Sequence, residues 1–431
     1  MTTIKAVRGT RDLLPPETAL WNRIEATARQ VFARYNFGEI RTPVFEDTGL
    51  FARGVGEETD IVSKEMYTWE DRARAQSEKT QSLTLRPENT AGVVRAYIEH
   101  QLGETGQLQK LYYIGPQFRR ERPQKGRYRQ FSQIGAEVIG PPSAGSESPI
   151  RDAEVLEMLA TLLDELGITG WVLELNSVGS PADRARYNET LRAALVPVVG
   201  QMCVDCQRRA ITNPLRVLDC KVPADQPFID TLPVIADSLD EASRAHFAAV
   251  TAALDAAGVP YTRNHRLVRG LDYYTRTTFE FTHGGLGAQN ALLGGGRYDG
   301  LSEAIGGPKA PGIGFAIGED RLVLTLQALE TAQLNKKAAA FIAPLGEPLN
   351  PAALALAREL RQAGLRIELG EGSFRLKKSF EAADKSARAI VILGEDELKS
   401  GILTVKTFST GIQTKVPRAQ LAAFLAEPAK G

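Results

Sequence analysis

The sequence is poor in cysteine and histidine, carries no net charge and contains no long apolar run. It has 3 Cys and 4 His among 431 residues, and its 52 Lys and Arg are balanced by 52 Asp and Glu. Zero net charge means that no global field attracts nucleic acid, so any RNA contact must come from a local patch. No apolar stretch approaches the ~18–20 residues that span a bilayer, and the N-terminal segment MTTIKAVRGTRDLLPPE has no signal-peptide core. We therefore expect a cytoplasmic protein that makes no membrane contact.

The three cysteines, Cys203, Cys206 and Cys220, are too few and odd in number for a disulfide framework. The Cys-x-x-Cys spacing raises the hypothesis of a structural zinc site, which needs four ligands. The nearest downstream histidine, His246, lies 26 residues beyond Cys220, so a fourth ligand is missing from the pattern. Buried thiols or a vestigial zinc knuckle are the favoured interpretation, and we expect no tightly bound metal.

The length of the chain indicates two or three domains. We expect a catalytic domain at residues 1–329, interrupted by a mostly helical, alanine-rich insertion at residues 181–258. A polar linker is expected at residues 330–337. At residues 338–431 strands and helices alternate, which predicts a compact second α/β domain with a mixed sheet.

Hydrophobic periodicity predicts individual elements of the first domain. Apolar residues at three-to-four spacing predict a helix at Glu17–Tyr35, followed by a strand at Phe37–Phe45. Residues 46–60 are rich in Gly and acidic side chains and are expected to form a loop. Residues 70–82 are polar and predicted to be mobile, and residues 267–281 have the composition of a strand.

The most informative stretch is residues 109–139, in which two predicted strands flank a strongly basic loop. The loop carries one acid, Glu121, against six basic side chains: Arg119, Arg120, Arg122, Lys125, Arg127 and Arg129. Arginine forks match phosphate bidentately, and the interleaved Tyr128 and Phe131 can stack on bases. The loop therefore indicates binding of a polyphosphate, of nucleic acid, or of both; a surface hairpin that is merely basic is the weaker alternative.

Three shorter motifs add to this stretch: residues 88–90, the glycines at residues 294–296, and the adjacent Tyr273 and Tyr274. A carboxylate and a hydroxyl, Glu88 and Thr90, directly precede a predicted helix at Ala91–His100 and could hold an ammonium group, with Asn89 or Thr90 as the helix cap. The triple glycine at residues 294–296 permits close backbone approach to a ligand. Each motif also has a plain structural interpretation: a capped helix without a ligand, a tight turn, or, for Tyr273 and Tyr274, core aromatics on a strand.

Taken together, these motifs resemble a known family. The run FRRERPQKGRYRQF at residues 118–131 is similar to motif 2 of class II aminoacyl-tRNA synthetases in the form used by histidyl-tRNA synthetases. The stretches LVRGLDYY at residues 267–274 and LLGGGRYDG at residues 292–300 resemble the histidine-specific signatures of that family, and residues 310–321 resemble motif 3. The resemblance implies an α/β (α+β) fold with an antiparallel catalytic sheet, a helical insertion and a C-terminal anticodon-binding-like domain.

The resemblance also implies a reaction. L-histidine would react with ATP, carried with Mg²⁺, to give histidyl-adenylate, and the histidyl group would pass to the 3′ end of histidine tRNA. The helix and strand after residue 17 resemble motif 1, which implies a homodimer. Neutral imidazole has one donor and one acceptor nitrogen, which a carboxylate and a phenol can satisfy together. Such a site can reject other amino acids without an editing domain.

Carried over by motif match, the implied catalytic residues are Arg119, which grips the α-phosphate and the histidine carboxylate, and Arg269 opposite it. The implied ATP-binding residues are Arg119, Glu121, Arg127, Phe131 and Arg321. The implied histidine-binding residues are Glu88, Asn89, Thr90, Arg119, Gln133, Glu137, Arg269, Tyr273, Tyr274 and Tyr298. Gln124 and Arg129 are expected to meet the acceptor end of the tRNA.

Three alternatives remain open at the level of sequence. A non-catalytic, synthetase-like regulatory subunit of ATP phosphoribosyltransferase would share the catalytic fold, but it typically lacks the C-terminal module and the reactive arginines. Another class II synthetase would share the motifs but not the Arg-Gly-Leu-Asp-Tyr-Tyr stretch. A general RNA-binding protein would not explain arginines embedded far from the basic loop.

Overall fold

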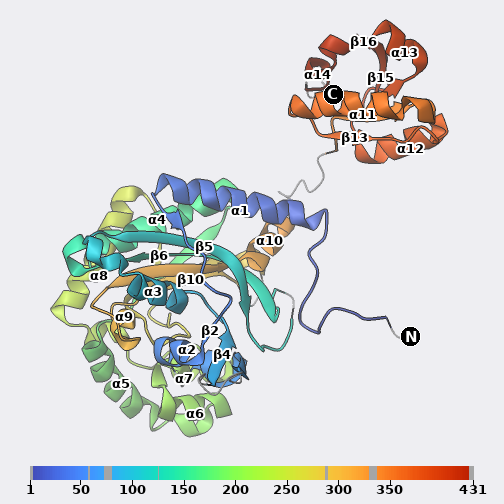
Figure 1. Cartoon of the computed structure of the whole chain (residues 1–431). Helices are drawn as coiled ribbons and strands as arrows, with labels where there is room; N and C mark the ends of the chain where they lie inside the picture. Colours follow the sequence, from blue (N-terminus) through green and yellow to red (C-terminus); the bar gives the residue numbers. More distant parts are fainter. Residues whose placement is uncertain are drawn as a thin grey trace. The chain divides into compact units, whose positions relative to one another are not determined.

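The computed structural model describes residues 3–56, 59–71, 80–124, 126–286, 290–329 and 337–426. Contacts within the chain divide it into two compact units, Met1–Ala332 and Gln333–Gly431, which are described separately (Figure 1). Most of the predicted linker at residues 330–337 and most of the predicted mobile segment at residues 70–82 lie outside the described residues.

The first unit is built on an eight-stranded sheet in the order β1-β5-β6-β11-β10-β9-β7-β8. All neighbouring pairs are antiparallel except β1 with β5 and β7 with β8. The strands are β1 Gly38–Glu39, β5 Gln109–Phe118, β6 Gln130–Ile139, β7 Trp171–Ser177, β8 Thr262–Arg263, β9 Thr275–His283, β10 Ala291–Arg297 and β11 Gly312–Gly318. A small second sheet has the order β2-β4-β3, with β2 Phe45–Asp47, β3 Tyr67–Asp71 and β4 Gln81–Leu85.

Helices cover both faces of the large sheet, and in Figure 1 α1 and α4 lie on one side while α2, α3 and α9 lie on the other. The helices of this unit are α1 Glu17–Arg34, α2 Thr48–Val55, α3 Thr90–Glu99, α4 Pro149–Leu166, α5 Pro181–Leu195, α6 Val204–Thr212, α7 Gln226–Ile229, α8 Glu241–Ala257, α9 Leu301–Ala304 and α10 Glu319–Ala328. The α1 side is apolar: Phe32 of α1 contacts the rings of Tyr112 on β5 and Phe315 on β11.

Strand register assigns the polar residues to the opposite face. Side chains alternate along a strand, and directly paired residues share a face. Because Tyr112 and Phe315 both pair with Ala136, these positions face α1. One residue further along β6, Glu137 pairs with Gly314 and therefore faces away from α1. We call this second face, away from α1, the pocket face.

Three predictions for individual elements were wrong. The predicted strand at Phe37–Phe45 is only β1 and the first residue of β2, because the chain leaves the large sheet after Glu39 and joins the small one at Phe45. The predicted loop at residues 46–60 contains α2, which starts where the Asp47 carboxylate accepts the N–H of Gly49 and which buries Phe51. The predicted strand at residues 267–281 begins only at Thr275.

The predicted insertion is helical, as expected, but its last helix joins the catalytic layers. Helix α8 packs against α4, and His246 of α8 hydrogen-bonds to Asp152 of α4 at 2.8 Å. Asp152 also accepts hydrogen bonds from Thr277 of β9 and from the fully buried Arg297 of β10. This network, defined by Asp152, His246, Thr277 and Arg297, ties two helices to two strands at the base of the sheet.

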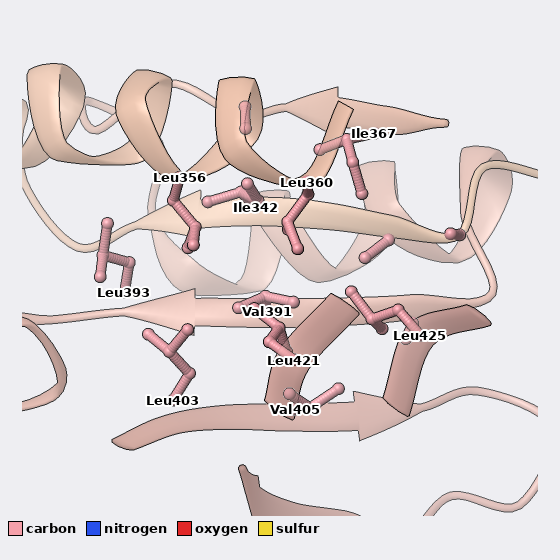
Figure 2. Close-up of a cluster of buried hydrophobic side chains, with 14 of the residues drawn as sticks. Ile342, Leu356, Leu360, Ile367, Val391, Leu393, Leu403, Val405, Leu421 and Leu425 are labelled. Carbon is pink, nitrogen blue, oxygen red and sulfur yellow. The ribbon is translucent and has the colours of Figure 1, made fainter. Parts of the chain in front are cut away.

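The second unit is a five-stranded mixed sheet in the order β13-β12-β14-β15-β16 with helices on both faces. Its elements are β12 Ala340–Pro344, α11 Asn350–Gln362, β13 Ile367–Leu369, α12 Leu376–Ser386, β14 Ala389–Leu393, α13 Glu395–Ser400, β15 Ile402–Thr407, β16 Gln413–Pro417 and α14 Arg418–Ala426. Strand alternation separates its two cores. Ile342 and Val391 meet α11 and α14, as Figure 2 shows, whereas Phe341 and Ile390 meet α12. Apart from the short α13, these elements match the alternation predicted from the sequence.

Candidate active site

A pocket of about 310 Å³ opens on the pocket face of the large sheet. Its walls come from β5, β6, β9, β10 and β11, from the start of α3 and α10, and from the loops that precede β6 and β9. Most of the predicted site residues line this single pocket: Glu88, Thr90, Arg119, Glu121, Arg127, Phe131, Gln133, Glu137, Arg269, Tyr273, Tyr274, Tyr298 and Arg321.

Arg119 follows directly after β5, and its side chain is held by a backbone carbonyl group and by an aromatic ring. Its Nε donates to the carbonyl oxygen of Pro87 at 2.8 Å, and its guanidinium carbon lies 5.4 Å from the ring centre of Phe131 on β6. These contacts use one edge and one face of the group. The Nη edge is left beside Glu121, 3.9 Å away, where an anion can approach.

Arg269 lies in the loop before β9 and lines the same pocket as Arg119. Its Nη1 donates to the carboxylate of Glu280 on β9, and its Nε is buried without a hydrogen-bond partner among the described residues. The guanidinium lies against Gly294 of β10, where an added Cβ would come within 2.6 Å of it. Gly294 therefore admits the arginine, because any larger side chain would occupy its place.

Two further arginines complete the cationic end. Arg127 of the basic loop donates to Glu121 at 3.0 Å and is nearly half exposed, so it is free to reorient. Arg321, in the first turn of α10, donates to the carbonyl oxygen of Ala291. Burial, and then the charge of Arg127, lower the pKa of Arg321, which indicates that the two guanidinium groups are close enough to repel each other. Such a pair is stabilised by a polyanion between them.

The opposite end of the pocket is acidic and deeply buried. Glu137, fully buried on β6, accepts a hydrogen bond from the Thr90 hydroxyl at 2.7 Å through Oε1, while its Oε2 has no partner among the described residues. Burial raises the pKa of Glu137 to about 8, against the opposing effect of the Thr90 hydrogen bond. A buried carboxyl group with an open oxygen can accept an N–H from a ligand.

Glu88 performs the capping that was expected of Asn89 or Thr90. Its two carboxylate oxygens accept the backbone N–H groups of Thr90 at 2.7 Å and Ala91 at 3.0 Å, at the N-terminus of α3. Burial raises the pKa of Glu88 as well. The carboxylate is thus fixed at the pocket wall by the helix that it caps.

Tyrosine rings line the space beside Glu137. The rings of Tyr273 and Tyr274 lie 4.7 Å apart, and the ring of Tyr298 lies 6.0 Å from that of Tyr273. The hydroxyl of Tyr298 is buried beside the Glu137 carboxylate, without a hydrogen bond of good geometry to it or to another described residue. Burial, followed by the charge of Glu137, raises the pKa of Tyr298, so the phenol remains a neutral donor.

Three predicted residues lie outside the lining of this pocket. Asn89 is buried, and its Oδ1 accepts from the Thr42 hydroxyl at 2.7 Å, while its Nδ2 has no hydrogen-bond partner among the described residues. Gln124 pairs through its backbone with Arg127 in the basic loop. Arg129 donates to the carbonyl oxygen of Arg8 at 3.4 Å, so it holds the N-terminal segment.

Two residues that the sequence analysis did not single out also line the pocket. Tyr113 of β5 reaches Glu137 Oε1 at 3.4 Å through its hydroxyl, and Glu280 pairs with Arg269. Alternation could have identified both. Tyr112 and Tyr113 are adjacent on one strand, so their side chains must face opposite sides of the sheet. Glu280 lies between Phe279 and Phe281, so its side chain must face the side opposite to theirs.

The residues that line this pocket belong to a chain that matches known protein families over nearly its whole length. The family model for histidyl-tRNA synthetase matches residues 9–322, and that for the anticodon binding domain matches residues 339–428. The chain belongs to the histidyl-tRNA synthetase family. This membership confirms the predicted fold class and the predicted activity, that of a histidine–tRNA ligase.

Individual relatives of this family agree over nearly the whole chain. The histidine–tRNA ligase of Koribacter versatilis (strain Ellin345) is 72% identical over 98% of this chain and 96% of its own length. That of Solibacter usitatus (strain Ellin6076) is 57% identical over 98% of this chain and 99% of its own. The crystal structure of apo histidyl-tRNA synthetase from S. aureus has a TM-score of 0.79 and 37% identity, covering 99% of this chain and all of that one.

Within the part of the chain that is described, every helix is too short or too polar to cross a bilayer.

Proposed function

We propose that this pocket carries out both steps of histidine–tRNA ligation, with ATP bound as its Mg²⁺ complex at the cationic end and histidine at the acidic end. The observation that supports this most strongly is that Arg119, Arg269 and Arg321, from three separate segments, line the same cavity as Glu137 and the tyrosines. Attack of the histidine carboxylate on the α-phosphate builds negative charge there, and fixed guanidinium groups stabilise it.

At the cationic end, Arg119 and Arg269 take the α-phosphate and the histidine carboxylate between them. The Phe131 ring stacks on the adenine, and Glu121 accepts its amino group. Arg127 and Arg321 hold the β- and γ-phosphates, which relieves the repulsion between these two side chains. The breaking bond lies between the α- and β-phosphates, so pyrophosphate leaves on the side of Arg127 and Arg321.

At the acidic end, the imidazole of histidine meets the open Oε2 of Glu137 and the unpartnered hydroxyl of Tyr298. One accepts the imidazole N–H and the other donates to the second ring nitrogen. Glu88, Thr90 and Gln133 surround the ammonium group, with Tyr273 and Tyr274 closing the pocket. A ligand without a donor and an acceptor at these positions would leave buried polar groups unpaired, which is the basis of selection for histidine.

A homodimer and a cytoplasmic location complete the proposal. An apolar patch at the small sheet supports the dimer: Phe45 is 52% exposed and Trp69 is 40% exposed, and their ring centres lie 6.1 Å apart. Exposed clusters of large apolar side chains commonly mark protein interfaces. Light scattering on the purified protein, compared with a Phe45→Glu variant, tests this assembly; a monomeric parent protein would contradict it. Gln124 and Arg129 stay the candidates for contact with the tRNA acceptor end.

The two ends of the pocket can be tested separately by ATP–pyrophosphate exchange with a panel of amino acids. Only histidine is expected to support exchange. Glu137→Gln is expected to raise the KM for histidine with little change for ATP, and Glu121→Gln is expected to do the reverse. If both variants weaken both substrates equally, the assignment of the two ends is wrong. If no amino acid supports exchange, the assignment of this pocket as the site of adenylate formation is wrong.

A further inference from the structure

The three cysteines of the insertion converge with an aspartate that the sequence pattern did not reveal. Cys203 precedes α6, Cys206 lies in its first turn, and Cys220 and Asp225 follow on separate turns. One ligand atom from each of these four residues lies within 4.8 Å of the others. A fourth side chain that can ligate a metal, Asp225, therefore lies beside the three cysteines, which the sequence pattern alone does not indicate.

The distances within this cluster suit a tetrahedral ion. With Zn–S bonds of ~2.3 Å and a Zn–O bond of ~2.0 Å, tetrahedral geometry places two sulfurs about 3.8 Å apart and a sulfur and an oxygen about 3.5 Å apart. The Sγ atoms of Cys203 and Cys220 lie 3.9 Å apart, and Cys220 Sγ lies 3.3 Å from Asp225 Oδ2. A disulfide would need a sulfur separation of ~2.05 Å, so the cysteines are spaced for a shared ion rather than for a bond.

Backbone N–H groups around the cluster hold its ligand atoms in place. The N–H of Cys203 donates to both carboxylate oxygens of Asp225, at 3.0 and 3.2 Å, and the N–H of Val222 donates to Cys220 Sγ at 3.4 Å. Cys206, Cys220 and Asp225 are all at most 5% exposed. Hydrogen bonds to metal ligands of this kind orient them and stabilise their charged forms.

We propose that Cys203, Cys206, Cys220 and Asp225 bind one structural Zn²⁺ ion. Three thiolates and one carboxylate form a closed set of four ligands, which is typical of a structural rather than a catalytic site. Soft thiolates select zinc over magnesium or calcium.

The position of the cluster connects the ion to the candidate active site. The carbonyl oxygen of Cys220 accepts from Gln226 Nε2 at 2.9 Å, and Gln226 Oε1 accepts from Arg266 at 2.6 Å. Arg266 lies three residues before Arg269, and Cys220 and Arg269 line the same open cavity of about 830 Å³. Zinc would thus hold the insertion against the segment that carries Arg269.

Metal analysis of the full-length protein, purified under reducing conditions without chelator, tests the proposal. About one zinc per chain is expected, and replacement by Co²⁺ should give a thiolate-to-cobalt charge-transfer absorption. Asp225→Asn should weaken binding at least about 10-fold, and Cys206→Ser should abolish stoichiometric binding. Asp219→Asn, at a neighbouring and more exposed carboxylate outside the cluster, serves as the matched control and should bind as the parent does.

Several results would overturn the proposal. One is iron in place of zinc. Another is neither bound metal nor cobalt absorption after the protein has been supplemented with these ions. A third is a Cys203–Cys220 disulfide in protein purified under reducing conditions. Asp225→Asn binding zinc as tightly as the parent would remove Asp225 from the ligand set. Because Cys206→Ser could unfold the insertion by itself, circular dichroism of this variant is compared with that of the chelated parent protein. The proposal requires the two to lose the same stability.

Discussion

The buried carboxyl group of Glu137 should make the ligand-free protein less stable as the pH rises. Its pKa is raised by burial from 4.5 to about 8 in the folded state. Between these two values the folded protein binds a proton that the unfolded chain has released, so the free energy of unfolding falls with increasing pH. At ~1.36 kcal/mol for each pKa unit, the ionised side chain costs ~5 kcal/mol once the pH exceeds 8.

Replacing Glu137 with Gln removes this titration while keeping the shape and the acceptor oxygen for Thr90. The difference in unfolding free energy, variant minus parent, should therefore increase from pH 5 to pH 9 by ~4 kcal/mol. Urea unfolding followed by tryptophan fluorescence suits the measurement, because Trp21, Trp69 and Trp171 all lie in the first unit. Glu319, whose pKa burial also raises to about 8, contributes equally to both proteins and cancels in the difference.

Saturating histidine provides the functional half of the same experiment. Histidine supplies an N–H to the open Oε2 of Glu137, which favours the ionised carboxylate and should remove most of the pH-dependent difference. Glu99→Gln, at an exposed carboxylate of α3, is the control and should follow the parent at every pH. If the curves of the parent and of Glu137→Gln run parallel from pH 5 to pH 9, the buried carboxyl is not the group that titrates and the reasoning fails.

Three further predictions address the rest of the site and its support. Arg269→Ala should leave the fold intact and slow adenylate formation by ~10²–10³ in single-turnover experiments; a rate within about threefold of the parent would refute its role. Gly314→Ala would place a Cβ 1.6 Å from Glu137 Oε2 and should abolish histidine activation while ATP still binds, whereas Gly318→Ala, on the same strand with its nearest contact at 4.0 Å, should retain activity. Asp152→Ala strands the fully buried Arg297 and should lower the unfolding free energy of the first unit by ~3–5 kcal/mol; Glu359→Ala, which breaks an exposed pair with Arg418, should cost at most ~1 kcal/mol.

Local patterns predicted the elements that bury a regular face. The apolar residues of helix α1 recur at three-to-four spacing, and the second unit alternates strands and helices. The bounds of these elements could therefore be predicted to within a residue or two. Helix α2 is not evident from the sequence because its glycines and the acidic residues on either side of it resemble a loop; the helix forms because Phe51 and Val55 are buried by tertiary packing. Likewise, the segment at residues 267–274 has the composition of a strand, yet it turns away from the sheet so that Arg269 can enter the pocket.

For the site as well, the sequence predicts the features that depend on local motifs but not those that depend on tertiary contacts. Residue types and motif order indicated which arginines, acids and tyrosines would gather, and the structure places most of them in one pocket. What the sequence could not show is which groups would find partners inside the fold. The Oδ1 of Asn89 accepts from Thr42, Glu88 caps α3, and Asp225 lies beside three cysteines, each through a contact that depends on the fold or on turn geometry.

The glycines of β10 and β11 explain how a flat sheet face becomes a binding pocket. From the sequence, the triple glycine was interpreted as a place where backbone approaches a ligand. In the structure, Gly294 lies under the guanidinium of Arg269 and Gly314 under the carboxylate of Glu137, each too close for a Cβ. The absence of a side chain at these glycines thus makes room for the side chains of Arg269 and Glu137, which pack against the sheet and line the cavity. A side chain at either position would lift the arginine or the acid into the space that the proposed substrates occupy, so these glycines shape the site without contacting a ligand themselves.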